Sequence, residues 1–140
     1  MEYNWIESEG LLSQVGIRRP DEFADKDNPV IVIIPGNPGL ARFYEDFANQ
    51  LYNQSGGCCQ IYVLSYLGAV ARGPAQKKMF QNKEKYLLKG QIRHKINLIN
   101  ALIPKERKII IVGHSIGSYI MLNSLDALVA VHNVYTNNLI

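Results

Sequence analysis

A glycine-flanked serine is the residue of this sequence whose surroundings point most clearly to chemistry. Residues 113–117 read Gly-His-Ser-Ile-Gly, so Ser115 lies in a Gly-x-Ser-x-Gly motif. The β-branched run at 108–112 is typical of a buried strand, and the apolar segment after the second glycine is typical of a helix. A serine on such a strand-to-helix turn has its hydroxyl lifted clear of the sheet, where it can act as a nucleophile. The alternative is a tight turn in which the serine only begins a helix.

The same turn contains groups that could stabilise negative charge. The backbone N–H of Ile116 would point to where an oxyanion develops, and the helix N-terminus would add partial positive charge. Gly113 and Gly117 are expected at their positions because a side chain at either would collide with the neighbouring strand or helix. No spacing typical of metal ligands occurs in the sequence, so we predict acyl-transfer chemistry at Ser115 without a metal or a cofactor.

A rigid loop follows the apolar run at 30–34. Residues 35–39 read Pro-Gly-Asn-Pro-Gly, and ligands of α/β proteins gather beyond the carboxyl ends of the strands. In a strand-turn-helix serine site the second oxyanion N–H comes from this kind of loop. Because the two prolines have no N–H, Asn37 is the first candidate donor and Gly36 the second. The alternative is a stiff turn that binds nothing.

Composition limits the classes to which the protein can belong. The chain has 140 residues, of which 47% are hydrophobic and 19% charged, as expected for a single globular domain over 1–140. A net charge of +3 is far too small for a nucleic-acid-binding face. The two cysteines, Cys58 and Cys59, are adjacent, which suits reduced thiols in a compartment facing the cytosol. We expect neither a secretory signal nor a transmembrane helix.

The hydrophobic pattern predicts an α/β fold with a mostly parallel sheet and crossover helices. Two weak strand signals near the N-terminus predict a β-hairpin, and longer apolar runs predict strands covered on both faces. Right-handed crossovers should connect them. The predicted elements are a hairpin from 3–6 and 12–17, strands at 29–34, 59–65 and 108–112, and helices at 41–53, 87–103 and 118–131.

Positive charge is concentrated in residues 66–86, which glycines and a proline interrupt. The basic residues of this segment are Arg72, Lys77, Lys78, Lys83 and Lys85. A solvated loop is the simpler interpretation. The alternative is contact with anionic lipid headgroups, since each basic residue near such a surface contributes on the order of 1 kcal/mol.

Three separated motifs occur in order along the chain. The first is Ile-Pro-Gly-Asn-Pro-Gly at 34–39, followed by Phe43-Tyr44. The second is Gly-Gln-Ile-x-His-Lys at 90–95, and the third is Val-Gly-His-Ser-Ile-Gly-Ser-Tyr at 112–119. Together these motifs resemble those of the lipid droplet-associated hydrolases, a branch of the α/β-hydrolase superfamily. The resemblance covers about 29–125 and implies the N-terminal half of an α/β-hydrolase fold.

The resemblance also implies an activity and a location. A member of this family is expected to be a serine hydrolase of neutral lipid, with cholesteryl esters or acylglycerols as the proposed ester substrates. It is expected on lipid droplets and on the cytosolic face of the endoplasmic reticulum, attached peripherally. By this resemblance Ser115 is the nucleophile, and the loop of Asn37 helps to form the oxyanion hole.

The sequence departs from the family pattern after the elbow. An α/β-hydrolase places an acid and then a histidine after the serine, and here only Asp126 and His132 are available. Along one continuous helix they would lie roughly 16 Å and 25 Å from Ser115, so neither is expected to form a triad. His94 precedes the serine and is interpreted as a helix-surface or packing residue.

We therefore expect residues 126–140 to be a divergent tail of a truncated domain. In the complete fold the strand before the serine is paired on both sides, so its apolar edge at 109–112 should be exposed here. Three functions remain open. They are a lipid ester hydrolase whose acid and histidine are missing from this chain, a non-catalytic fragment that binds lipid droplets, and a lipid acyltransferase on the same scaffold. Nothing in the sequence specifies the oligomeric state.

Overall fold

The computed structural model describes residues 1–140 apart from 23–24, 26, 72–82, 106 and 140. In the described part, six strands form one sheet in the order β1-β2-β4-β3-β5-β6. The strands are β1 Glu2–Ser8, β2 Leu11–Arg18, β3 Val30–Ile34, β4 Gln60–Leu64, β5 Lys108–His114 and β6 Asn133–Leu139. The α-helices are α1 Glu45–Gln54, α3 Leu88–Leu102, α4 Ile116–Leu122 and α5 Leu125–Val129, and the 3-10 helices are η1 Ala41–Tyr44 and η2 Lys83–Tyr86.

The first two strands form the β-hairpin that the sequence predicts. They pair antiparallel with Ser8 opposite Leu11, and the two residues of the turn, Glu9 and Gly10, have φ values of 50° and 73°. Two consecutive positive φ values are typical of the turn whose twist matches that of a hairpin. β2 also pairs antiparallel with β4, so the hairpin covers one edge of the parallel strands.

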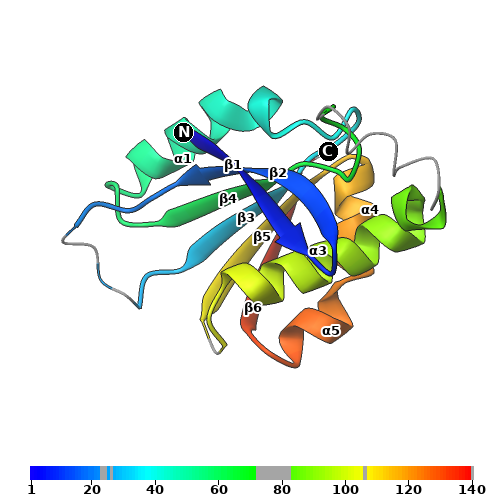
Figure 1. Ribbon diagram of the computed structural model, residues 1–140. Helices are drawn as coiled ribbons and strands as arrows, with labels where there is room; N and C mark the ends of the chain where they lie inside the picture. Colours follow the sequence, from blue (N-terminus) through cyan, green and yellow to red (C-terminus); the bar gives the residue numbers. More distant parts are fainter. Residues whose placement is uncertain (23–24, 26, 72–82, 106, 140) are drawn as a thin grey trace.

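The parallel strands β4, β3 and β5 form the centre of the sheet, and helices cover both faces (Figure 1). Every residue of β3 is buried. Alternate side chains of the strand belong to two different clusters: Val30, Val32 and Ile34 pack in the cluster that includes α3, α4 and α5, while Ile31 and Ile33 pack in the cluster that includes α1. This double burial explains why the strand is apolar at every position.

The expectation of an exposed edge on β5 is wrong. β6 pairs with β5 in parallel along its whole length, from Lys108 opposite Asn133 to His114 opposite Leu139. The sequence of β6, Asn-Val-Tyr-Thr-Asn-Asn-Leu, contains three strand-favouring residues among polar ones. Because asparagines interrupt this segment, it contains no apolar run from which a strand could be predicted. Strand pairing uses the backbone and requires no apolar side chain, so the segment can still form a strand.

The helix expected at 118–131 is also wrong in one respect, because two short helices occupy this segment. α4 ends at Leu122 and α5 begins at Leu125. At the break, the Nδ2 of Asn123 donates to the carbonyl of Tyr119, and the hydroxyl of Ser124 donates to the carbonyl of Ile120. Side chains of this type compete with the helical hydrogen-bond pattern. No helix in the described residues is long and apolar enough to cross a membrane.

The inner face of α3 carries three buried polar side chains that hold loops in place. The amide of Gln91 accepts from the N–H of Leu67 and donates to its carbonyl. The Nε2 of His94 lies 3.0 Å from the hydroxyl of Ser13 in the hairpin, so of the two roles that the sequence leaves open for His94, helix surface or packing, the structure shows packing. Lys95 is fully buried, and burial lowers its pKa to about 7.

The buried imidazole makes the stability of the fold depend on pH. Burial, and secondarily the charge of Lys95, lower the pKa of His94 from 6.5 to about 3. Between these values the unfolded chain binds one proton more than the folded chain, so the free energy of unfolding should decrease as the pH falls, by up to about 1.4 kcal/mol per pH unit. Urea unfolding across this pH range should show a shallower decline for His94→Gln. An unchanged pH dependence in this variant would contradict the assignment.

Candidate active site

Ser115 occupies the turn between β5 and α4, and its side chain is exposed. Its backbone has φ 53° and ψ −124°. A non-glycine residue at positive φ outside the left-handed helical region is held there only by the surrounding structure. This strained turn between a strand and a helix is the elbow that the motif predicts, and the residue on it is exposed.

The two elbow glycines lie where backbone segments meet. A Cβ built on Gly113 would lie 2.7 Å from the Cα of Ser118, and a Cβ on Gly117 would lie closer still to the carbonyl oxygens of Ile34 and Pro35. The collisions predicted for side chains at these positions are therefore confirmed. Gly117 allows the first turn of α4 to rest on the end of β3, which brings the loop after β3 to the serine.

The loop after β3 contacts the elbow directly. A Cβ on Gly36 would lie 3.2 Å from the Cβ of Ser115, and the N–H of Gly39 donates to the carbonyl of Gly36 over 2.7 Å, closing a turn. Asn37 is at the exposed tip of this turn. On the other side of the serine, Ile116 is the first residue of α4, where a helix has no internal partner for the N–H.

Gly36, the second candidate donor, has its N–H engaged in this structure. It donates to the hydroxyl of Tyr44 over 2.7 Å. The same hydroxyl lies 2.6 Å from the Nδ1 of His114, the residue before the serine. Tyr44 follows the motif at 34–39, but the sequence alone indicates no role for it. Its contact with His114 exists only because the folded chain places η1 against the end of β5.

Comparison with known proteins agrees with this geometry. Residues 27–136 match the model of the family described as lipid-droplet associated hydrolase. The chain belongs to this family. The match extends beyond the boundary expected near residue 125 and includes the first part of β6.

Curated relatives carry the name lipid droplet-associated hydrolase. The Pongo abelii protein is 36% identical over 114 residues, which cover 75% of this chain and 35% of the relative. The Rattus norvegicus protein is 35% identical over 124 residues, covering 83% and 36%, and the Drosophila melanogaster protein is 35% identical over 104 residues, covering 71% and 34%. The chain thus spans about a third of the length of these relatives.

Solved structures with the same arrangement of elements are α/β hydrolases. The mouse α/β hydrolase domain-containing protein 10 superposes with a TM-score of 0.68 at 15% identity, over 99% of this chain and 49% of the mouse chain. A laboratory-evolved variant of the potato epoxide hydrolase superposes with a TM-score of 0.66 at 16% identity, over 98% and 39%. The chain therefore has part of an α/β-hydrolase fold.

The three histidines of this family member are each hydrogen-bonded to a residue other than Ser115. His132 lies 3.0 Å from the side-chain oxygen of Asn100 and directly precedes β6, at the end where β5 begins. Ser115 follows the opposite end of β5, which at seven residues is roughly 20 Å long. His132 therefore cannot act as its base, as expected from the sequence, although the helix assumed in that argument is interrupted.

Asp126, the acid expected to lie too far from Ser115 for a triad, is exposed on α5. Asp126 lies in the first turn of that helix, beyond the break that follows α4. His114 is next to Ser115 in the chain, but its Nδ1 is directed to Tyr44. Within the residues that the structure describes, the elbow and the loop after β3 thus meet beside His114, whose Nδ1 is engaged by Tyr44 and not by Ser115.

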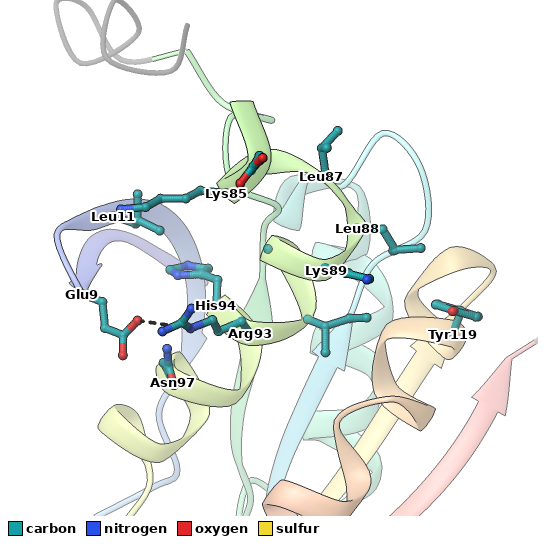
Figure 2. A pocket seen from close by; sticks show the side chains of 13 residues that line it. Glu9, Leu11, Lys85, Leu87, Leu88, Lys89, Arg93, His94, Asn97 and Tyr119 are labelled. Carbon is teal, nitrogen blue, oxygen red and sulfur yellow. Dashed lines mark ion pairs between the residues drawn. The ribbon is translucent and has the colours of Figure 1, made fainter. Parts of the chain in front are cut away.

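A groove of about 900 Å³ runs along α3, between the hairpin turn and the first turn of α4 (Figure 2). Apolar Leu87 and Leu88 line it together with basic Lys85 and Lys89. Arg93 also lines it and forms an ion pair with Glu9, with 3.9 Å between the charged atoms. Arg72, Lys77 and Lys78, named in the headgroup interpretation, lie outside the described residues.

Replacing Gly117 with alanine should destabilise the fold through the contact at the end of β3. The new methyl group would collide with backbone carbonyls, which cannot rotate away as a side chain would. We expect a loss of more than about 2 kcal/mol in the free energy of unfolding by urea. Gly56→Ala is the matched control, because a Cβ there meets open space and only the positive φ costs about 1 kcal/mol. Equal losses in the two variants would refute the steric explanation.

Proposed function

We propose that this protein is a serine hydrolase of carboxylic esters of neutral lipid, cholesteryl esters or acylglycerols, with Ser115 as the nucleophile. The observation that carries the proposal is the position of Ser115, exposed at a strained turn and in contact with the loop of Asn37. Membership of a family named for hydrolysis and for lipid droplets supports both the reaction and the substrate class.

In the proposed reaction the hydroxyl oxygen of Ser115 attacks the ester carbonyl carbon, and its proton passes to a general base. The carbonyl oxygen becomes an oxyanion, which the N–H groups of Asn37 and Ile116 would stabilise. Collapse of the tetrahedral intermediate releases the alcohol and leaves an acyl-serine. Water then attacks the acyl-serine, releasing the fatty acid and restoring the hydroxyl.

The general base is the part of the proposal that these residues do not supply. Each histidine described above has another partner, and a serine without a base is a neutral hydroxyl and a poor nucleophile. The matched segment covers only 35% of the Pongo abelii relative. We therefore propose that in family members of that length the histidine and the acid come from outside the matched segment, as the usual chain order of this fold requires.

A fluorophosphonate probe tests the nucleophile. It should label Ser115, with the site identified by peptide mass mapping, and Ser115→Ala should abolish the label. The rat relative should be labelled at its equivalent serine at least about a thousandfold faster than the 140-residue chain, because loss of triad partners costs several orders of magnitude. Denatured protein controls for non-specific reaction. Absence of label at this serine in both proteins would refute the proposed function.

The proposal also includes a place of action, the phospholipid surface of lipid droplets and of the endoplasmic reticulum. The family name supports droplets, and the groove along α3 offers a chemistry that fits such a surface. Leu87 is 63% exposed and Tyr119 49% exposed, and Lys85 and Lys89 lie in the same groove, both exposed. Apolar side chains beside cations suit a surface whose headgroups are anionic and whose interior is apolar.

Charge removal tests this place of action. Lys85→Gln with Lys89→Gln should lower the partition of the protein onto triolein droplets coated with phosphatidylcholine and phosphatidylserine about 30-fold, because each lysine contributes on the order of 1 kcal/mol. Droplets coated with phosphatidylcholine alone should show little difference. Lys105→Gln with Lys108→Gln, where β5 begins and outside the groove, removes the same charge and should leave the partition unchanged. Equal effects of the two pairs would exclude this surface.

A further inference from the structure

Two tyrosine hydroxyls hold one peptide group beside the serine. The hydroxyl of Tyr66 donates to the carbonyl of Pro35 over 2.5 Å, and the N–H of Gly36 donates to the hydroxyl of Tyr44 over 2.7 Å. That carbonyl and that N–H belong to the same peptide group, the one joining Pro35 to Gly36. Because a peptide group is planar, hydrogen bonds at both of its ends fix the orientation of its plane.

Tyr66 is itself held by the rest of the fold. Its N–H donates to the carbonyl of Gly39 over 2.8 Å, and its ring lies where a side chain on Gly39 would be. Lys95, from the inner face of α3, lies with its Nζ 5.4 Å from the centre of this ring and donates to the carbonyl of Ser65 over 2.7 Å. The end of β4 and the helix α3 therefore support the hydroxyl that reaches Pro35.

Tyr44 connects the same peptide group to the elbow. Its hydroxyl accepts the N–H of Gly36, so its own hydrogen is free to be donated to the Nδ1 of His114, 2.6 Å away. The two rings meet edge to face with their centres 5.9 Å apart. Since His114 directly precedes Ser115, any movement of the loop relative to the serine would break this chain of hydrogen bonds.

We propose that Tyr44 and Tyr66 are positioning residues that hold the Pro35–Gly36 peptide so that the N–H of Asn37 faces the oxyanion formed at Ser115. This inference rests on the proposed function. The Asn37 N–H belongs to the next peptide group, and only the two backbone torsions of Gly36 separate it from the held one. Glycine adopts many torsions at little cost, so holding the first peptide group limits the directions available to the second.

A purely structural role for the two tyrosines makes a different prediction. It predicts that loss of either hydroxyl lowers stability without changing the Asn37 amide or the chemical step at the serine. Tyr52 provides the comparison, since its hydroxyl donates to Asp21 over 2.5 Å and it lies in α1 away from the elbow. Tyr52→Phe therefore removes one tyrosine hydrogen bond of the same kind without touching the loop.

The first measurement is made on the 140-residue chain by amide NMR and does not depend on activity. Tyr44→Phe should accelerate hydrogen exchange at Gly36 at least about tenfold, because the N–H loses its acceptor. Tyr44→Phe and Tyr66→Phe should each shift the Asn37 amide resonance, whereas Tyr52→Phe should not. Should one variant fail to fold, the other tests the same peptide group from its other side. An Asn37 resonance unchanged in both variants would overturn the proposal.

The second measurement is the reaction of Ser115 with a fluorophosphonate over a range of probe concentrations. The maximal rate of the covalent step should fall at least about tenfold in Tyr44→Phe and Tyr66→Phe, against the 10²–10³-fold typical for complete loss of an oxyanion donor. The half-saturating concentration should stay unchanged, and Tyr52→Phe should match the wild type. A maximal rate within about twofold of the wild type in both variants would overturn the proposal. If wild-type Ser115 is not labelled, the proposed function fails, and the NMR measurement alone decides whether the tyrosines hold the loop.

Discussion

The structure depends on the close approach of α4 to the end of β3. Gly117 lies against the carbonyl oxygens of Ile34 and Pro35. Gly36, in the loop after β3, lies against Ser115. The parallel register places Ile34 opposite Gly113, so β3 and β5 end at the same level and their loops leave the sheet side by side. The candidate site forms only where the two loops meet. Their close approach requires residues without side chains at Gly36, Gly113 and Gly117.

Strain at the elbow is compatible with stability because of what surrounds it. Ser115 has a positive φ, which for a residue with a side chain costs on the order of 1–3 kcal/mol. β5, which leads into it, is paired with β3 on one side and with β6 on the other, and the hydroxyl of Ser118 donates to the carbonyl of Gly113 across the turn. Paired strands and this bond leave the turn no relaxed alternative that preserves the sheet.

The sequence predicts the elbow and the loop beside it better than it predicts the elements that support them. Ser115, its two glycines and the proline-rich loop are recognisable because each needs an unusual residue type at a fixed spacing, and the central strands are recognisable because burial on both faces makes them continuously apolar. β6 is not recognisable in this way, because its asparagines interrupt any hydrophobic pattern. Its pairing with β5 uses backbone groups, which leave no signal in the sequence. The break after Leu122 arises from side-chain hydrogen bonds that compete with the helix, which a hydrophobic pattern cannot reveal.

The polar motif on α3 illustrates how residues of a family pattern can hold loops in place without supplying a reacting group. Gln91, His94 and Lys95 are buried, and each is hydrogen-bonded to a loop or to the hairpin. Burying a lysine costs enough to lower its pKa to about 7, and a hydrophobic residue in its place would fill the same space at no such cost. What the hydrophobic residue could not do is hold the Ser65 carbonyl beside Tyr66, and through Tyr66 the carbonyl of Pro35. The cost of the buried amine is therefore best explained by the position of a loop that lies two contacts away.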